Sequence, residues 1–452
     1  MVKLWQGESA QWRVELELNG EGAALSLRMK EEGRVLSVCL GGQPTENTLR
    51  RAAAKAVKAL RDLGVNSAVL DAAPAVKALG PEGAAALAQG AELACYRQPS
   101  WKQGEDKPFA LYLAGGSGLE AALAQADAVT RAVCFARDLV NCPANLLTPE
   151  DMARRMAQAA GELGVEVELL DQARTRALGM GAYHAVADSA IHPPQLIVLR
   201  WRGGKQGVPP IALVGKGVCC DTGGYCLKTA AGLKGTRGDM AGGAAVCGAL
   251  LALAENKIPV NAVAVIPAVE NRLSADSFLP GDVIRSMSGK TIQVNNTDAE
   301  GRLILADAVT YAIHLEGAAR VVDIATLTGA CVAALGFTTA GLLSNDDGFC
   351  AALLNAAARA GEQYWRLPHF PEYEKMIESP VADLCNQSSD GCGAITAGLF
   401  VGAFAQGLPW IHLDIAGTAW VDRPRWEYQT AGATGAGVST LYELCRGLAD
   451  ES

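Results

Sequence analysis

Two acidic residues, Asp298 and Glu300, lie two positions apart in a polar stretch between apolar segments. Asn296 precedes them, and Arg302 begins a segment with the apolar spacing of a helix. Burying such a pair of carboxylates is costly unless cations neutralise them. The stretch 295–307 therefore predicts a site that holds cations.

A second charged stretch, residues 215–243, supplies complementary groups upstream. It contains Lys216, Asp221, Lys228 and Asp239 among glycines and apolar residues. Carboxylate oxygens are hard donors that can bridge two metal ions, and the carboxylates of the two stretches together match the charge of two divalent cations. A buried lysine beside cations can lose its proton and act as a ligand. The two stretches together predict a two-metal hydrolase.

Other sites fit these residues less well. The Gly-Lys pair at 215–216 lacks both the spacing of a phosphate-binding P-loop and the Ser or Thr directly after the lysine. The five histidines include no pair at i,i+4 spacing, which argues against a histidine-rich zinc site. A solvated charged face fits poorly, because these charges lie among glycines and apolar residues.

Composition is typical of a globular enzyme. The chain has 452 residues, is 50% hydrophobic and carries a net charge of −9. This balance argues against disorder, and the bulk charge argues against nucleic acid as a main partner. The 13 cysteines form no CxxC pair, and residues 1–20 lack the apolar core of a secretory signal. We expect a cytoplasmic protein with reduced thiols and no membrane span.

Hydrophobic periodicity predicts two α/β domains. Residues 1–125 form a smaller N-terminal α/β domain with a role in scaffolding or assembly, and residues 126–452 form the catalytic domain. In the first, we expect strands at 12–18, 34–40 and 67–70 and helices at 48–63, 80–93 and 117–140. In the second, we expect strands at 165–170, 195–201, 210–215, 260–269, 320–325 and 409–415 and helices at 240–254 and 302–315.

This alternation predicts a largely parallel mixed sheet flanked by helices in the catalytic domain. Active sites of such sheets gather at the carboxyl ends of strands. Both charged stretches follow expected strands, so we expect them to meet there.

The spacing of the charged residues resembles the leucine aminopeptidase (cytosol aminopeptidase) family. The resemblance is carried by Lys216, Asp221, Lys228 and Asp239 together with Asn-Thr-Asp-Ala-Glu-Gly-Arg at 296–302. It continues through the segments 325–329, 365–368, 393–397 and 432–435 and covers residues 130–445. The Gly-Gly-Tyr after Asp221 is more similar to the bacterial peptidase B-like branch.

The resemblance implies a role for each matching residue. Asp221 and Glu300 would bridge two metal ions, Asp298 would complete one site, and Lys216 and Asp239 would complete the other. A water bridging the metals would be the nucleophile.

The remaining matching residues would act on the substrate. Lys228 would stabilise the oxyanion, and Arg302 would hold a bicarbonate that serves as general base. The substrate-binding positions would be Asn296, Thr326, Leu327 and Gly329. Asp307, further along the expected helix, is expected to be structural.

The resemblance also implies an exopeptidase that releases N-terminal amino acids from peptides, assembled as a homohexamer. Oxygen-rich sites accept zinc, manganese and magnesium, and the resemblance implies two Mn²⁺ or Zn²⁺ ions per subunit. The alternatives are a catalytically inactive family member that acts as a structural or binding protein, and a metal phosphohydrolase on a similar sheet.

Two departures from the family pattern concern the surroundings of the metal residues. Cys219 and Cys220 replace an expected Thr-Phe, and we expect them to be small buried residues. Thr236 replaces a methionine expected in the specificity pocket. The substitution leaves open whether leucine is the preferred first residue.

Overall fold

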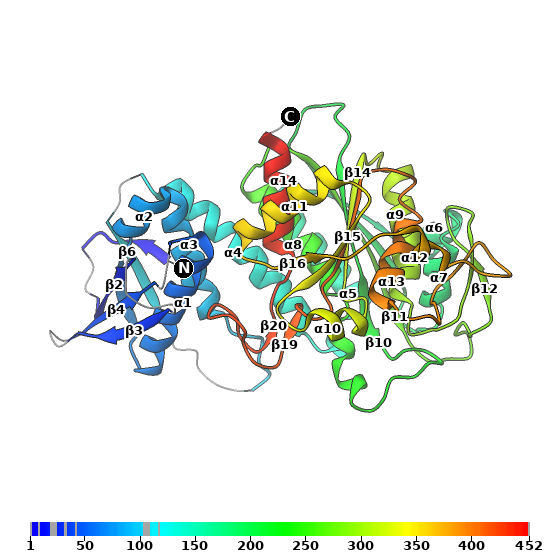
Figure 1. The fold of residues 1–452 in the computed structure, drawn as a ribbon, viewed down its shortest axis with the longest axis horizontal. Helices are drawn as coiled ribbons and strands as arrows, with labels where there is room; N and C mark the ends of the chain where they lie inside the picture. The colour runs from blue at the N-terminus through cyan, green and yellow to red at the C-terminus, as the bar shows by residue number, and fades with distance from the viewer. Residues whose placement is uncertain are drawn as a thin grey trace. The chain divides into compact units, whose positions relative to one another are not determined.

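The chain forms two compact units, shown in Figure 1. The computed structural model describes residues 2–7, 10–18, 25–30, 34–40, 43–102, 109–115 and 118–450. Unit 1 comprises Met1–Cys134, Arg359–Gly361 and Asp422–Gly432, and unit 2 comprises the rest of the chain. The scaffold or assembly role expected for residues 1–125 stays a prediction.

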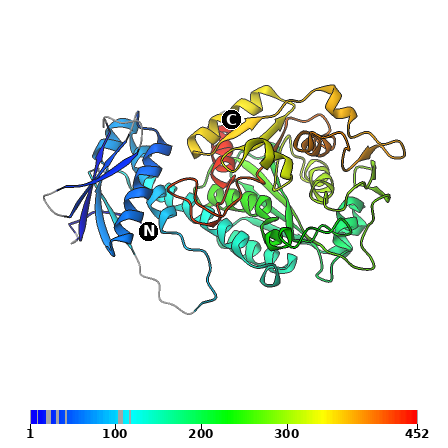
Figure 2. The ribbon, with the colours of Figure 1, turned by 60° about the horizontal axis from the view of Figure 1, so that its bottom comes forward.

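Unit 1 contains a six-stranded sheet in the order β1-β6-β5-β2-β4-β3. Its strands are β1 (Val2–Leu4), β2 (Trp12–Glu17), β3 (Ser26–Met29), β4 (Val35–Cys39), β5 (Ser67–Asp71) and β6 (Ala110–Ala114). Only the β3–β4 pair is antiparallel among these described strands. The helices are α1 (Glu46–Asp62), α2 (Ala73–Leu79), α3 (Pro81–Cys95) and α4 (Glu120–Asn141), the last running into unit 2. Figure 2 shows the first three beside the strands. Residue 117, where the expected fourth helix begins, lies outside the described residues.

Helix α1 forms for reasons that are visible in its sequence. Thr45 caps its first turn through a capping box with Thr48. Leu49, Val57 and Leu60 lie on one face at helical spacing and are all fully buried. The helix therefore covers the sheet with an apolar stripe, as the periodicity predicts.

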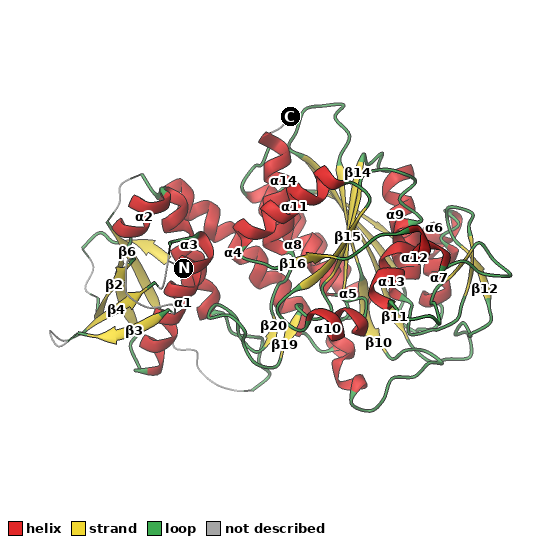
Figure 3. Cartoon of the chain, viewed as in Figure 1, coloured by secondary structure: helices red, strands yellow, loops and turns green. Residues whose placement is uncertain are grey.

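Unit 2 is built on a nine-stranded mixed sheet, drawn in yellow in Figure 3. The strand order is β16-β15-β18-β14-β9-β11-β8-β7, with β10 beside β11. The strands are β7 (Glu166–Leu170), β8 (Gln195–Arg202), β9 (Ile211–Gly215), β10 (Gly217–Asp221), β11 (Asn261–Asn271), β14 (Arg320–Ala325), β15 (Ala340–Ser344), β16 (Tyr364–Arg366) and β18 (Trp410–Asp414). The central strands β18, β14, β9 and β11 are parallel, and antiparallel pairs flank them. The predicted fold class is confirmed.

Smaller elements surround this sheet. A three-stranded sheet joins β12 (Val283–Arg285), β13 (Thr291–Gln293) and β17 (Leu384–Cys385), and a pair joins β19 (Trp420–Val421) and β20 (Gly432–Ala433). The helices are η1 (Ala144–Leu146), α5 (Pro149–Glu162), α6 (Gln172–Ala177), α7 (Gly181–Ala187), η2 (Gly232–Gly238), α8 (Ala241–Glu255), α9 (Gly301–His314), α10 (Gly329–Leu335), α11 (Asp347–Ala360), α12 (Pro371–Lys375), α13 (Gly393–Gly402) and α14 (Val438–Asp450).

Helices cover both faces of the nine-stranded sheet. Helix α8 and helix α9 each pack on β9, β11 and β14, from opposite sides. Figure 1 shows α8 with α14 on one side of the strands and α9 with α13 on the other. Residues 232–255 are long and apolar enough to cross a membrane by composition, but 83% of their apolar window is buried inside the protein. This is typical of a core helix.

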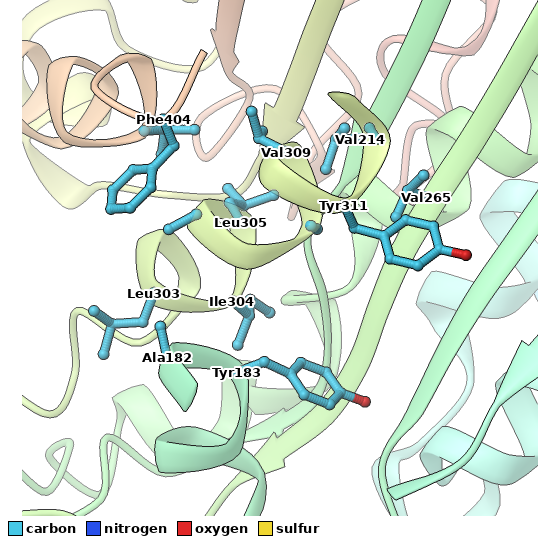
Figure 4. Close-up of a cluster of buried hydrophobic side chains, with 14 of the residues drawn as sticks. Ala182, Tyr183, Val214, Val265, Leu303, Ile304, Leu305, Val309, Tyr311 and Phe404 are labelled. Atoms are coloured by element: carbon cyan, nitrogen blue, oxygen red, sulfur yellow. The ribbon is translucent and has the colours of Figure 1, made fainter. Parts of the chain in front are cut away.

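Helix α9 is apolar on nearly all sides. Leu303, Ile304, Leu305 and Val309 are fully buried, and Figure 4 shows them pointing outward from the helix in several directions. Tyr183 of α7 packs in the same cluster. Such a helix is held in the interior by packing on all sides, and its first turn lies at the edge of the sheet that carries the charged residues.

The carboxyl edge of the sheet brings the charged stretches together. Lys216 follows β9, Asp221 ends β10, and Thr326 follows β14. These strands are parallel through β11 and β9, so their carboxyl ends share one edge. The order and direction of these strands therefore place the charged residues at the carboxyl edge of the sheet, where the site was expected.

The close approach of α8 to this edge predicts a position that accepts only glycine. A Cβ at Gly242 would lie 2.0 Å from Ile324 O and 2.9 Å from Lys216 N. We expect Gly242→Ala to lower the free energy of unfolding by about 1–3 kcal/mol through overpacking. The matched control is Gly161→Ala in α5, where a Cβ meets no atom within 4 Å. Replacing an exposed helical glycine should stabilise the protein by about 0.5–1 kcal/mol. Equal shifts in thermal unfolding for both variants would contradict the packing argument.

Candidate active site

Three carboxylates converge at the carboxyl edge of the sheet. Asp221, Asp298 and Glu300 each offer an oxygen, and these oxygens lie within 4.8 Å of one another. The side chains of Asp221 and Glu300 are 4% and 1% exposed, and that of Asp298 is 33% exposed. Such a group of like charges away from water requires cations.

Two lysines supply part of that positive charge. Lys216 Nζ lies 2.7 Å from Asp239 Oδ2 and 2.8 Å from Glu300 Oε1. Lys228 Nζ lies 2.7 Å from Asp221 Oδ2 and also contacts Asp298 Oδ1. The structure thus brings together all four predicted carboxylates and both lysines. Asp239 lies outside the group formed by Asp221, Asp298 and Glu300 and is connected to it through the Lys216 ammonium. The carboxylates exceed the lysines by two charges.

The electrostatics of the site indicate a deficit of positive charge. Burial and the nearby Asp221 raise the pKa of Glu300 to about 8. Burial raises the pKa of Asp239 to about 6 against the opposing effect of Lys216. Burial alone would lower the pKa of Lys216, but the carboxylates around it outweigh burial and raise it. Without further cations, the cluster therefore tends to hold protons.

The donor set fits divalent cations. Glu300 Oε2 is buried and has no hydrogen-bond partner within the described part of the chain. A buried carboxylate oxygen without a donor is costly, whereas an oxygen that ligates a metal is satisfied. The residues that could hold metal ions are those predicted, namely Lys216, Asp221, Asp239, Asp298 and Glu300.

Two uncharged residues that sequence reasoning missed position the metal-ligand candidates. Thr297 Oγ1 donates to Gly223 O at 2.7 Å and accepts from Cys226 N at 2.8 Å, so it ties the loop that precedes Lys228 to the turn carrying Asp298. Asn271 Nδ2 donates to Asp221 Oδ1 at 2.9 Å. Asn271 is the last residue of the buried strand β11, and a polar residue at that carboxyl end is a signal that could have identified it.

Glycine at the start of α9 allows a lysine to reach Glu300. A Cβ at Gly301 would lie 2.5 Å from Lys216 Cε and 2.7 Å from Lys216 Nζ. Any larger residue would push the ammonium away from its carboxylates. Close packing against Lys216 therefore explains why glycine occupies position 301, between Glu300 and Arg302.

Arg302 is one of the residues that line a cavity of about 380 Å³. The residue is 6% exposed, its Nη1 donates to Asn386 O at 2.6 Å, and its Nε has no described hydrogen-bond partner. Burial lowers the pKa of its guanidinium to about 10. A buried cation with an unused donor that borders a cavity is suited to hold an anion.

The predicted substrate-binding residues fall into two groups. Asn296, Leu327 and Gly329 line the same cavity as Arg302. Thr326 is not among the lining residues, and its hydroxyl donates to Asp239 Oδ1 at 2.7 Å. The structure thus places Thr326 beside a metal-ligand candidate.

Asp307 lies further along α9 and faces away from the cavity. Its carboxylate accepts from Tyr183 N at 2.9 Å and from Met287 N at 2.7 Å. It connects α9 to the start of α7 and to the loop after β12.

The residues that depart from the family pattern are buried or half-buried. Cys219 and Cys220 are 1% and 6% exposed. Thr236 in η2 is half-buried and does not line the 380 Å³ cavity. The cysteines thus lie where small buried residues are expected.

Comparison with protein families gives two matches. Residues 134–442 match the model of the catalytic domain of the cytosol aminopeptidase family, and residues 20–105 match that of its N-terminal domain. A “Probable cytosol aminopeptidase” of Alkaliphilus metalliredigens is 47% identical over 330 residues, covering 73% of this chain and 66% of that protein. One from Alkaliphilus oremlandii is 42% identical over 413 residues, covering 89% of this chain and 82% of that protein.

Solved structures show the same fold. The bottromycin maturation enzyme BotP in complex with Mn superposes with a TM-score of 0.88 at 33% identity, covering 98% of this chain and all of that chain (100%). A tomato leucine aminopeptidase mutant superposes with a TM-score of 0.86 at 29% identity, covering 99% of this chain and 96% of that chain.

The charge deficit predicts that divalent cations stabilise the folded chain. At 100 times its dissociation constant, Mn²⁺ should add about 2.7 kcal/mol to the free energy of unfolding. Glu300→Gln should lose most of this gain, because it removes a buried anionic oxygen. Glu372→Gln, at an exposed position in α12, is the control and should respond like the wild type. Thermal unfolding with and without Mn²⁺ measures the effect, and an undiminished shift in Glu300→Gln would contradict the assignment.

Proposed function

The chain belongs to the cytosol aminopeptidase family, and on that premise we propose that it releases N-terminal amino acids from peptides at the centre formed by Asp221, Asp298 and Glu300. It is accordingly a metallopeptidase, a hydrolase. The observation that supports this site most directly is the convergence of three carboxylates around the buried, unpartnered Glu300 Oε2.

The residues would hold two divalent ions, Mn²⁺ or Zn²⁺. As the resemblance implies, Asp221 and Glu300 would contribute to both ions, Asp298 to one of them, and Lys216 and Asp239 to the other. When bound, two such ions acidify a water molecule and polarise the scissile carbonyl. Mn is present in the similar BotP structure, which favours manganese.

Lys228 would stabilise the negative charge that develops on the scissile carbonyl oxygen. Its side chain is 25% exposed, and its ammonium contacts both Asp221 and Asp298. Burial would lower the pKa of Lys228, but Asp221 and Asp298 outweigh burial and keep it protonated. A fixed cation aimed at a developing oxyanion lowers the activation barrier.

Arg302 would hold a bicarbonate that serves as general base. Its Nη1 is occupied by a main-chain carbonyl, and the remaining donors of the guanidinium would bind a planar anion in the cavity that Arg302 lines. The guanidinium suits a carboxylate-like ligand because it presents donors in one plane. Arg302 thereby orients the base without taking up the proton itself.

The cavity beside Arg302 would receive part of the peptide. Asn296, Leu327 and Gly329 would contact the substrate there, whereas Thr326 would act through Asp239. The cavity is lined mostly by polar residues and glycines, and such polar groups would orient a bound peptide through hydrogen bonds.

Three finer assignments stay predictions. The resemblance alone supports the homohexameric assembly and the placement in the peptidase B-like branch. Cysteine usage and the composition of residues 1–20 support the cytoplasmic location.

The proposed function predicts metal-dependent turnover. In a panel of aminoacyl-p-nitroanilides, we expect release of p-nitroaniline that rises on adding Mn²⁺ and is lost on chelation. Glu300→Ala should abolish activity while the fold, measured by circular dichroism, is retained. No turnover with any aminoacyl group or metal would overturn the proposal and favour an inactive relative.

The anion role predicts a second, separable effect. Arg302→Ala should lower kcat by about 10²-fold or more, as expected for loss of a general base, and should remove any stimulation by bicarbonate. Arg320→Ala, which replaces an exposed arginine at the amino end of β14, is the matched control. Persistent bicarbonate stimulation in Arg302→Ala would refute the assigned anion site.

A further inference from the structure

Asn386 is a fully buried polar residue next to the candidate active site. It directly follows β17 and is 0% exposed. Its main-chain N–H donates to Gln293 O at 3.0 Å, which extends the β13–β17 pairing by one residue. The small sheet therefore fixes the main chain of Asn386.

The side-chain amide of Asn386 holds the turn that carries Asp298. Its Oδ1 accepts from Asn295 N at 2.7 Å and from Asn296 N at 3.2 Å. Its Nδ2 donates to Asn296 O at 2.7 Å and to Ala299 O at 3.4 Å. The two donors face the oxygen and the two acceptors face the nitrogen, so a flipped amide would lose these hydrogen bonds. Both halves of the amide are needed.

The main-chain carbonyl of the same residue holds the anion-site arginine. Asn386 O accepts from Arg302 Nη1 at 2.6 Å, and Arg302 is one of the residues that line the cavity. One residue thus contacts both the turn bearing a metal-ligand candidate and the guanidinium. Residues 387–389, which follow it, line the cavity.

We propose that Asn386 is a positioning residue that couples the metal site to the anion site. This inference rests on the proposed function. Through its amide, Asn386 holds the main chain on both sides of Asp298. Through its carbonyl, it holds Arg302 at a fixed distance from that turn. Loss of the amide breaks the link between the turn that bears Asp298 and the main chain that holds Arg302, so the turn and the guanidinium are no longer held at a fixed separation and both sites respond.

A neutral amide suits this position better than a charged residue. An acid would repel the carbonyl oxygens of Asn296 and Ala299 and compete for Arg302, and a base would repel Arg302 and the metal ions. Asparagine supplies two donors and two acceptors without adding charge. A merely structural residue would affect stability but would not affect metal binding and anion response together.

The chain offers a matched control in Asn345. This exposed residue after β15 uses its amide in the same way, accepting from Trp410 N at 2.8 Å and donating to Leu408 O at 2.9 Å. Strand β15 is antiparallel to β18, so Asn345 lies at the edge of the sheet opposite to the site. Its replacement removes similar hydrogen bonds without touching the metal turn.

The experiment compares Asn386→Ala and Asn345→Ala with the wild type in the full chain. Calorimetry measures the dissociation constant of Mn²⁺, and steady-state kinetics with and without bicarbonate measure kcat and KM. We expect Asn386→Ala to weaken Mn²⁺ binding by about 10-fold or more, as for other residues that orient metal ligands. We also expect kcat at saturating Mn²⁺ to fall and the stimulation by bicarbonate to weaken. The change in KM should be smaller than the fall in kcat. Asn345→Ala should lower only the melting temperature.

The outcomes separate this inference from the proposed function. Wild-type Mn²⁺ affinity and bicarbonate response in a folded Asn386→Ala variant would overturn the inference alone. Absence of Mn²⁺ binding by the wild type would overturn the proposed function and the inference with it. If Asn386→Ala does not fold, the experiment uses Asn386→Ser, which retains one hydrogen-bonding group. We expect this variant to lose both Mn²⁺ affinity and bicarbonate stimulation, each to a smaller extent. A folded Asn386→Ser variant with both at wild-type values would also overturn the inference.

Discussion

An excess of buried negative charge at one edge of the nine-stranded mixed sheet is the constraint on which unit 2 depends. Glu300 is placed there by the start of α9, and Asp221 by the end of β10. Neither residue can move to water without moving an element of the core. Lys216 lies between Glu300 and Asp239 because Gly301 leaves room for it. The packing of the core and the electrostatics of the site are therefore linked, because Gly301 serves both: it starts a core helix and leaves space for the Lys216 ammonium.

Uncharged side chains do most of the positioning around this charge. Thr297 and Asn271 hold the two acidic loops together, and Asn386 holds the turn that follows β13. Additional charged residues would compete with metal ions or with the lysines for the carboxylates. Hydroxyl and amide groups give direction without changing the charge. The charged residues therefore identify the site in the sequence. The residues that position them are polar and neutral, and they give no comparable sequence signal.

The charged residues and the long strands could be predicted from the sequence because their signals are local. β9, β14 and α8 lie within a residue or two of their expected ranges, since continuous apolar runs mark buried elements. Asn386 could not be predicted, because its partners are about 90 residues away and no periodicity marks a two-residue strand such as β17. Strand β10 was not predicted for another reason. It follows β9 after a single residue, Lys216, and lies within the Gly-rich charged stretch that was expected only to follow a strand.

Helix α9 raises a question that apolar packing alone does not answer. A helix buried on all sides gains similar hydrophobic free energy at several rotations about its own axis. Arg302 and Asp307 are five residues apart and so point roughly 140° from each other. Asp307 holds main-chain N–H groups of Tyr183 and Met287 on one side, and Arg302 holds Asn386 O on another. Any rotated arrangement would bury both charges without partners. The two polar anchors thus select one rotational register for α9, and that register aims Arg302 at the cavity.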